Sequence, residues 1–458
     1  FQPAALLALI AITGCSSTSG GFQSGWRAYN DGQYTSASEI WRPLAEHGHA
    51  DAQYLLGLMY EQGLGVEQDL PEAAHWYRLA AEQEHVGAQN NLGMLYFHGR
   101  GVTQDHQQAA KWYEKAAEQG FAPAQSNLAA VHLFDHEDHN NIDTARRLLQ
   151  DAAAQGHAKG QYLLGSLYYD GRGVDRDYDK AVRWFRRAAE QDFPRAQHDM
   201  GVMYQHGRGV MQHTRKAVTW HRRAAEQGFA SSQHTLGVMY ADGNGVTQSD
   251  EKAVHWYRLA AQQGYASAQS NLGLMYLKGR GVQQSDKKAH RWLQAAADRD
   301  VPEAQFVLGW MHYKGRGVEK DPAQAATWLR RAADDGLGLA QMNLGLLHLK
   351  GHGVAKNYEQ AAKWYRQAAD QGIAEAQSKL GMMYEHGRGV AQDDVAAYMW
   401  YSLGAELGYE PAEKHVGILD GKLTSTQIAE ARNRADRWLE KREQISQQVA
   451  GAPLPTNE

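Results

Sequence analysis

The sequence repeats itself every 36 residues, and no other feature constrains its fold as strongly. An alanine recurs in ten successive registers: Ala73, Ala109, Ala145, Ala181, Ala217, Ala253, Ala289, Ala325, Ala361 and Ala397. A glutamine keeps the same step: Gln53, Gln89, Gln125, Gln161, Gln197, Gln233, Gln269, Gln305, Gln341 and Gln377. A period of this length indicates a solenoid, in which each unit packs only on its neighbours. The 458 residues therefore need no separate domain cores, although length alone would predict about three domains.

Each unit is predicted to contain two helices, which we call helix A and helix B. In helix A of one unit, Gln89, Leu92 and Tyr96 lie at i, i+3 and i+7, the spacing of one helical face. Gly93 on the same face lowers helix propensity by about 1 kcal/mol relative to alanine, so we expect a neighbouring helix to approach it closely. The Gly-x-Gly-Val turn that follows, at residues 99–102, comes after a helix and not after a strand. It is therefore not predicted to bind phosphate.

Helix B is preceded by a residue suited to cap its first turn. The position is filled by Asp69, Asp105, Asn141, Asp177, His213, Ser249, Ser285, Asp321, Asn357 and Asp393. The side chains of most of these residues accept hydrogen bonds from the unpaired amides of a helix start. A tryptophan in helix B keeps the 36-residue step in nine units, with Leu148 in its place in the third.

Together these motifs resemble the Sel-1-like repeat family, a branch of the tetratricopeptide-like superfamily. The matching patterns are Ala-Gln-x-x-Leu-Gly-x-x-Tyr, Gly-Arg-Gly-Val and Ala-x-x-Trp-Tyr-x-x-Ala-Ala, and they cover residues 50–408. The resemblance implies an all-α fold, a right-handed solenoid of about ten helix-turn-helix repeats with a concave face. It also implies an adaptor that binds other proteins. We expect residues 22–408 to form the solenoid including a degenerate leading hairpin, 409–447 a helical cap, and 448–458 a disordered tail.

The first residues resemble a bacterial lipoprotein signal. Residues 1–14 are mostly apolar and are predicted to be part of a signal peptide. The segment Ile12-Thr13-Gly14-Cys15 resembles a lipobox, which implies that Cys15 is lipidated and followed by a flexible linker within residues 15–21. The alternative is an apolar tail with a chance cysteine. The lipobox predicts an outer-membrane lipoprotein of the cell envelope, facing the periplasm or the surface, with contact to the membrane through the lipid only.

Two rows of helix A are candidates for partner binding. The first row carries asparagines, which are poor helix formers and can hydrogen-bond an extended peptide: Asn91, Asn127, Asn271 and Asn343. The alternative is that these amides satisfy the end of a neighbouring helix. The adjacent positions carry rings that can anchor a partner: Tyr54, Tyr162, His198, His234, Phe306 and, one turn further on, Trp310. The alternative for these rings is packing against the next repeat.

Other functional classes are less favoured. A net charge of −5 and a pI near 6.5 give no electrostatic footprint for nucleic acid. Residues 135–140 combine histidine and carboxylates, but they lie in an irregular loop, so we predict a change of curvature there and no metal site. Ser249 and Lys252, like Ser285 and Lys288, match Ser-x-x-Lys, which makes an envelope hydrolase such as a β-lactamase or a peptidoglycan-related enzyme the alternative function. Both serines occupy the capping position, so we predict no enzyme, no cofactor and no small-molecule substrate, and a scaffold that binds a protein or peptide through the concave helix-A face.

Overall fold

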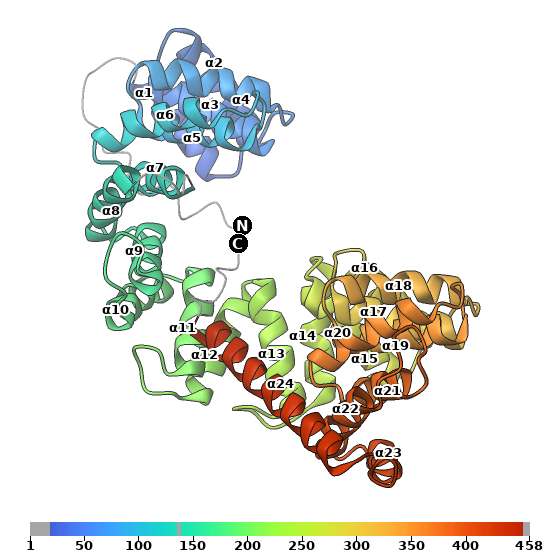
Figure 1. The fold of residues 1–458 in the computed structure, drawn as a ribbon. Coiled ribbons are helices and arrows are strands. Elements are labelled where there is room, and N and C mark those ends of the chain that lie inside the picture. Colours follow the sequence, from blue (N-terminus) through green and yellow to red (C-terminus); the bar gives the residue numbers. More distant parts are fainter. Residues whose placement is uncertain (1–18, 135–138, 452–458) are drawn as a thin grey trace. The chain divides into compact units, whose positions relative to one another are not determined.

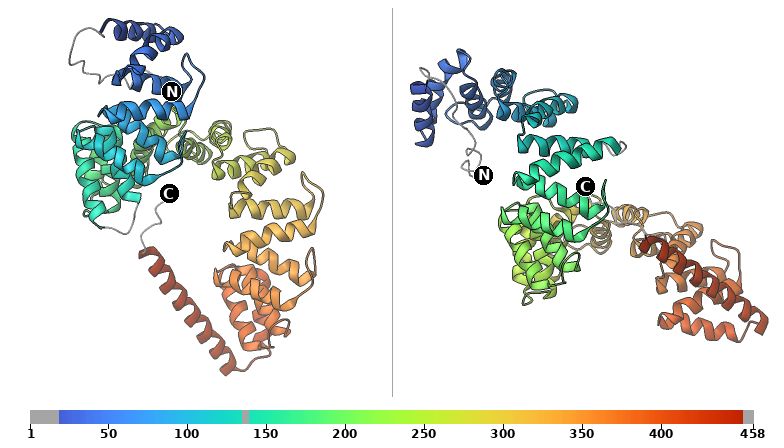
Figure 2. Two further views of the ribbon diagram at one scale, coloured as in Figure 1. Left: turned by 90° about the horizontal axis from the view of Figure 1, so that it is seen from above. Right: turned by 90° about the vertical axis from the view of Figure 1, so that its left-hand side faces the viewer.

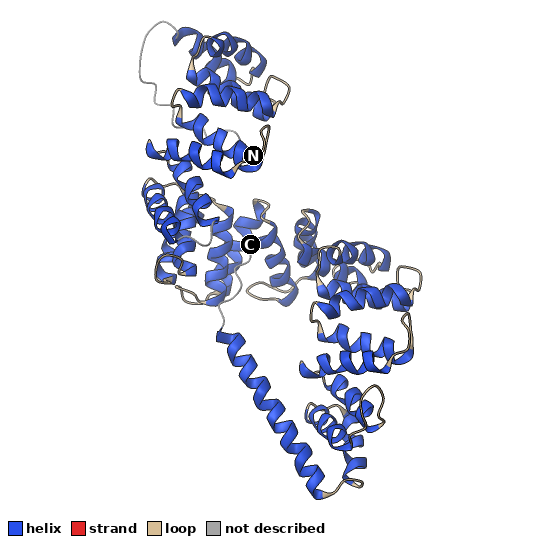
Figure 3. Cartoon of the chain, turned by 45° about the horizontal axis from the view of Figure 1, so that its top comes forward, coloured by secondary structure: helices blue, strands red, loops and turns tan. Residues whose placement is uncertain are grey.

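The computed structural model describes residues 19–134 and 139–451, and over these residues it contains 24 helices and no strand (Figure 3). The chain divides into two compact units, residues 1–227 and 228–458. We call them the N-terminal unit and the C-terminal unit and describe each by itself. The all-α fold class expected from the sequence is confirmed.

The helices of the N-terminal unit are labelled in Figure 1. They are α1 (Ser19–Asn30), α2 (Tyr34–Glu46), α3 (Ala50–Gln62), α4 (Leu70–Glu82), α5 (Val86–His98), α6 (His106–Glu118), α7 (Ala122–Phe134), α8 (His139–Ala154), α9 (Ala158–Asp170), α10 (Tyr178–Glu190), α11 (Pro194–His206) and α12 (Thr214–Glu226). The pairs from α3–α4 to α11–α12 are repeats 1 to 5, each with helix A first and helix B second.

The C-terminal unit continues the same pattern. Its helices are α13 (Ala230–Asp242), α14 (Asp250–Gln262), α15 (Ala266–Lys278), α16 (Asp286–Ala297), α17 (Pro302–Lys314), α18 (Pro322–Asp334), α19 (Gly338–Lys350), α20 (Tyr358–Asp370), α21 (Ala374–Glu385), α22 (Asp394–Glu406), α23 (Glu410–Asp420) and α24 (Ser425–Gly451). The pairs from α13–α14 to α21–α22 are repeats 6 to 10. The yellow and orange helices of this unit lie one after another in chain order (Figure 2, left).

The caps predicted before helix B are present in nine repeats. The Asp69 carboxylate, for example, accepts a hydrogen bond from the Glu72 amide at 3.0 Å and so satisfies one amide at the start of α4. The cap predicted at Asn141 is wrong, because α8 begins two residues earlier, at His139.

The two glycines of the turn have different roles. Gly99 ends α5 in the left-handed conformation, at φ 65°. Gly101 has φ 70°, and a Cβ on it would lie 2.3 Å from the carbonyl carbon of Leu70, the first residue of helix B in the preceding repeat. The turn therefore rests directly on the preceding repeat, which requires glycine on steric grounds.

The glycine inside helix A lies where helix B approaches closely, as expected. A Cβ on Gly93 would lie 2.7 Å from the ring of Tyr113, which is buried in helix B of the same repeat. The same contact recurs between Gly237 and Tyr257 at 2.4 Å. In these repeats helix A and helix B therefore pack closely because one contributes no side chain and the other contributes a ring.

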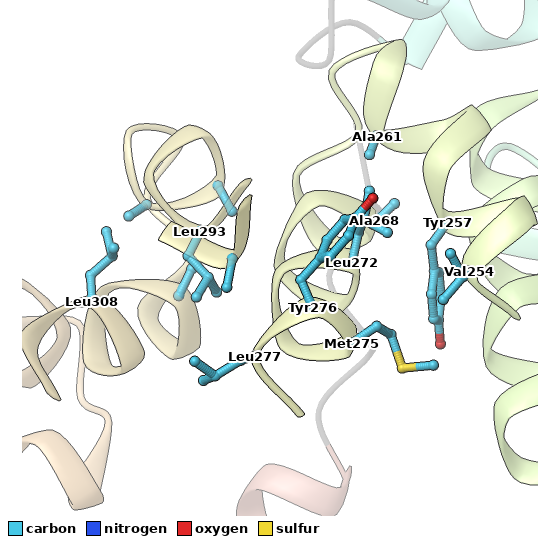
Figure 4. Packing of buried hydrophobic residues seen from close by; sticks show 14 of the residues in the cluster. Val254, Tyr257, Ala261, Ala268, Leu272, Met275, Tyr276, Leu277, Leu293 and Leu308 are labelled. Carbon is cyan, nitrogen blue, oxygen red and sulfur yellow. The ribbon is translucent and has the colours of Figure 1, made fainter. Parts of the chain in front are cut away.

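A core runs between successive helices of each unit. Figure 4 shows part of it in the C-terminal unit, where Tyr257, Leu272, Leu293 and Leu308 come from α14, α15, α16 and α17. The three leucines are completely buried, and the tyrosine is 3% exposed. Between repeats, the buried Gln89 side chain donates a hydrogen bond to the carbonyl of Ala81 at 3.1 Å, which joins α5 to α4.

Additional helices lie before the first repeat and after the last. Before repeat 1, Tyr29 of α1 and Trp41 of α2 pack with ring centroids 5.7 Å apart. After repeat 10, Trp438 of α24 packs edge-on against Trp400 of α22, with centroids 5.7 Å apart. Helix α24 extends to Gly451, into the segment from Gln448 for which we expected no order. None of the helices in the described part of the chain is long and apolar enough to cross a membrane.

Candidate partner-binding face

The candidate binding surface lies on helix A and is built from four recurring positions. We call it the helix-A face and define it by the positions of Asp51, Tyr54, Leu55 and Leu58 in repeat 1 and their equivalents at each step of 36 residues. The residue types at these positions change from repeat to repeat, whereas the glutamine, leucine and glycine beside them recur. The helix-A face is therefore a variable surface on a constant frame.

The structure corrects the expectation for Asn91. This residue is only 7% exposed. Its Oδ1 accepts a hydrogen bond from the side-chain amide of Asn90 at 3.3 Å, and its side chain lies near the hydroxyl of Tyr54 in the preceding repeat. An extended partner has little access to it, so we leave Asn91 out of the proposed binding surface.

The other three predicted asparagines are half-buried. The amide of Asn127 donates to Oδ1 of Asn90 at 2.8 Å, and Asn271 hydrogen-bonds Nε2 of His234 at 3.1 Å. Both contacts join neighbouring repeats, but they are made to side chains and not to the end of a neighbouring helix, which was the alternative for this row. The amide of Asn343 instead donates to the Leu339 carbonyl of its own helix at 2.8 Å, so it makes no such contact with the preceding repeat.

These contacts show that the asparagine row and the ring row are one ladder. The ladder joins the Tyr54 position of one repeat to the Leu55 position of the next, 37 residues later. Besides the two asparagine pairs, Tyr162 and Asp199 stand in this register and lie close enough that each affects the pKa of the other. The sequence placed these residues in two separate rows and gave no sign of the pairing.

The predicted rings pack within the repeats and keep an edge toward solvent. Tyr54 stacks on His85, which caps the next helix A, with centroids 4.5 Å apart. Tyr162 lies 5.3 Å from Phe193, and His234 lies 5.2 Å from Tyr265, at the equivalent capping positions. All three rings are nevertheless only half-buried. Packing against the next repeat, which was the alternative for these rings, therefore buries one part of each ring. The other part is exposed on the helix-A face.

The remaining predicted rings are also half-buried. His198 lies 5.0 Å from the ring of His221 in the N-terminal unit. In the C-terminal unit, Phe306 packs beside the core of α18 and α19, and the guanidinium of Arg316 lies 5.2 Å from the ring of Trp310. Phe306 and Trp310 stand one turn apart on α17, so repeat 8 presents the largest apolar side chains of the predicted set.

Burial determines the charge of the titratable groups on this face. It lowers the pKa of His198 and of His234 to about 4, so both imidazoles are neutral at pH 7. Burial also raises the pKa of the Asp199 carboxyl to about 7, against the smaller effects of Tyr162 and Arg195. The middle of the helix-A face therefore carries less charge than its composition indicates.

Two cations on this face were not predicted. Lys159 and Arg195 are the second residues of α9 and α11, at the position of Asp51. The ammonium of Lys159 donates to Oδ1 of Asn127 at 2.6 Å. The sequence does contain a signal, because a basic residue in the first turn of a helix opposes the helix dipole.

The serine and lysine of each Ser-x-x-Lys match do not face one another as a nucleophile and a base. Ser249 and Ser285 accept hydrogen bonds from the backbone amides of Lys252 and Lys288, each at 3.3 Å, and so cap α14 and α16. The ammonium of Lys252 lies 5.4 Å from the ring centroid of Tyr240, and that of Lys288 lies 5.5 Å from Tyr276. The structure thus gives both motifs a capping role.

The irregular loop of repeat 3 and the lipobox were also singled out in the sequence. Residues 135–138 of the irregular loop, and Cys15 with its lipobox, lie outside the described residues. Over the rest of the chain, within the described ranges, no group of three or more histidine, cysteine or acidic side chains is placed to hold a metal ion.

The repeats match a known family along most of their length. The Sel1 repeat model matches ten consecutive segments: residues 50–85, 86–121, 122–157, 158–193, 194–229, 230–265, 266–301, 302–337, 338–373 and 374–409. The chain belongs to the Sel1 repeat family. Each matched segment contains one helix A and one helix B, so the family repeat and the structural repeat coincide.

Solved structures support the same assignment. A protective antigen of uropathogenic Escherichia coli strains with an SLR fold is 32% identical, covers 96% of both chains and has a TM-score of 0.74. A Sel1 repeat protein from Oxalobacter formigenes is 36% identical, covers 68% of this chain and 89% of its own, and has a TM-score of 0.53. Comparison with curated proteins gave no match. The Sel1 repeat solenoid is typically a protein-interaction scaffold, and this chain has that fold.

Proposed function

We propose that this Sel1 repeat protein is a cell-envelope scaffold that binds an extended protein or peptide segment along the helix-A face. The observation that supports this most strongly is the contrast on helix A between a constant frame and variable positions that are at least partly exposed in most repeats. Phe306 and Trp310 illustrate it, because each occupies a position where the other repeats carry different residue types. A surface that served only to pack the repeats would repeat with them.

The chemistry of the face suits a peptide. Half-buried rings such as Tyr162 and Trp310 offer apolar contact at low entropic cost, because a ring has few rotatable bonds. The amide of Asn343 has a second N–H, since only one is needed for the Leu339 carbonyl. The equivalent positions follow one another along each unit, and an extended segment is the form of ligand that can contact them in succession.

The test is a peptide selection followed by affinity measurement. A phage-displayed library of random peptides is selected against the immobilised full chain, and Kd is then measured for the wild type and for Trp310→Ala. We expect Trp310→Ala to weaken binding by roughly tenfold or more, as for a central aromatic anchor. Arg330→Ala, an exposed residue on helix B of the same repeat, is the matched control and should bind as the wild type does. A library that yields no binding peptide, or equal binding by Trp310→Ala, contradicts the proposal.

We further propose that the protein is attached to the outer membrane through a lipid on Cys15. The support is the segment Ile12-Thr13-Gly14-Cys15, in which the only cysteine of the chain stands where a lipobox needs it. The Escherichia coli relative is described as a protective antigen, which fits a protein that antibodies can reach. Cys15→Ser is expected to move the protein from the membrane fraction to the soluble fraction. Membrane retention of Cys15→Ser would contradict the anchor.

A further inference from the structure

Repeats 4 and 5 place positive charge where other repeats place negative charge. Lys159 and Arg195 are the second residues of α9 and α11, and the equivalent position carries Asp51, Glu303 or Glu375 in three other repeats. The amino end of a helix bears partial positive charge, so a cation in the first turn is unfavourable and an acid is favourable. A residue that opposes the local chemistry of its helix, and that has no balancing contact inside the fold, indicates a functional role.

Within the described residues, neither Lys159 nor Arg195 forms an ion pair. The hydrogen-bond partner of the Lys159 ammonium is a neutral atom, Oδ1 of Asn127, at 2.6 Å. Burial and, secondarily, the charge of Arg195 lower the pKa of Lys159. Two cations therefore stand close enough to affect one another, and one of them is half-buried without a counter-charge.

An acidic group near Arg195 does not remove this excess of charge. Asp199, one helical turn after Arg195, is half-buried and lies beside Tyr162. Because burial raises the pKa of its carboxyl to about 7, Asp199 is only partly ionised at neutral pH. The helix-A face of repeats 4 and 5 thus keeps a net positive charge that an external anion would balance.

We propose that Lys159 and Arg195 form a subsite for the carboxylate of an aspartate or glutamate side chain in the bound segment, with Asn127 positioning the ammonium of Lys159. This inference rests on the proposed function, because it assigns the charge of the segment that the helix-A face binds. The ammonium has three donors and Asn127 takes one of them, so two remain for a carboxylate. The helix-A face continues before the subsite through repeats 1 to 3 of the same unit, where for example Tyr54 is half-buried. A segment can therefore run on beyond the subsite, which favours a side-chain carboxylate over a chain terminus.

The test uses the full chain and the same displayed library, built with the peptide carboxyl end fused to the coat protein so that no free terminus is present. The wild type is expected to enrich peptides containing aspartate or glutamate. Lys159→Glu with Arg195→Glu should lower the affinity for those peptides by roughly tenfold or more and should enrich basic peptides instead. The matched control is Arg183→Glu with Arg187→Glu on helix B of repeat 4, which changes net charge equally and should retain the wild-type preference.

The melting temperature distinguishes a variant that has lost the subsite from one that has lost its fold. Acids at residues 159 and 195 agree with the helix dipole, so the charge-reversed variant should melt at a temperature equal to or above that of the wild type. Enriched peptides without an acidic bias, bound equally by the wild type and the charge-reversed variant, overturn the subsite and leave the proposed function standing. A library from which the wild type enriches nothing overturns both.

Discussion

The side-chain amide of Gln119 donates a hydrogen bond to Oε1 of Gln89 at 3.0 Å, across the 30 residues that separate helix A from the end of helix B in one repeat. Gln89 itself donates to the Ala81 carbonyl of the preceding repeat, so the two glutamines form a relay between repeats. The same pair recurs as Gln53 with Gln83 at 2.7 Å. Buried amides that lack such a partner are costly to stability.

The relay predicts where a glutamine would stabilise the fold. Oε1 of Gln305 and Oε1 of Gln377 have no hydrogen-bond partner, and the residues 30 positions later are Asp335 and Leu407 instead of glutamine. Leu407→Gln should raise the free energy of unfolding by about 0.5–1.5 kcal/mol, since it completes the pair and Leu407 is 57% exposed. Urea denaturation checks this, with Gln119→Ala expected to lower stability by a similar amount. A neutral or destabilising Leu407→Gln would contradict the relay.

Replacement of the glycine in helix A by alanine is expected to destabilise the fold, although helix propensity predicts the opposite. Gly237→Ala should lower the free energy of unfolding by about 1–3 kcal/mol, because the new methyl would lie 2.4 Å from the ring of Tyr257. Propensity alone would predict a gain of about 1 kcal/mol. Tyr257→Leu in the same chain should recover part of the loss, since repeat 3 carries Ala129 and Leu149 at these two positions, buried in one cluster. Thermal unfolding of the single and double variants decides between the two signs.

A buried histidine predicts acid sensitivity. His221 is completely buried at the position of Tyr113, neither ring nitrogen has a hydrogen-bond partner, and burial lowers its pKa to about 3. The folded state therefore binds fewer protons than the unfolded state below about pH 6.5, so stability falls as pH decreases, by up to about 1.4 kcal/mol per pH unit. His221→Phe, which copies Phe185, should reduce this dependence between about pH 6 and pH 4, while His198 and His234 keep their own contribution. An unchanged slope in urea denaturation would contradict the assignment to His221.

Two asparagines of helix A are expected to have different roles, one in stability and the other in peptide binding. Asn91→Ala should lower the melting temperature, because Asn91 is 7% exposed and hydrogen-bonded to its neighbours. Asn343→Ala should leave the melting temperature unchanged and weaken the binding of selected peptides, since its amide bonds only a carbonyl of its own helix. Peptide affinity and melting temperature measured on both variants check this, and a melting temperature lowered equally by both would contradict it.

The sequence was sufficient to predict most of the fold. The 36-residue step, the caps such as Asp69 and the close approach at Gly93 follow from local rules of helix chemistry. The cap at Asn141 was wrong because repeat 3 lacks the Gly-x-Gly-Val turn that fixes the register elsewhere.

The candidate site was less predictable because it depends on contacts between repeats. Asn91 is buried and lies near Tyr54, 37 residues earlier, and periodicity within one helix does not indicate this proximity. Whether Lys159 and Arg195 have a counter-charge likewise depends on residues that are near in space and distant in the sequence. The sequence could show only that both cations oppose a helix dipole.

The central claim is that a partner binds along helix A, and site-specific photo-crosslinking tests it most directly. A photoreactive phenylalanine analogue is placed in the full chain at position 306 or 343 on the helix-A face, or at position 183 or 330 on helix B, and envelope extracts are irradiated with each variant. We predict that one partner crosslinks to positions 306 and 343 and not to positions 183 and 330. A partner captured with equal yield at the helix-B positions, or only there, would contradict this account.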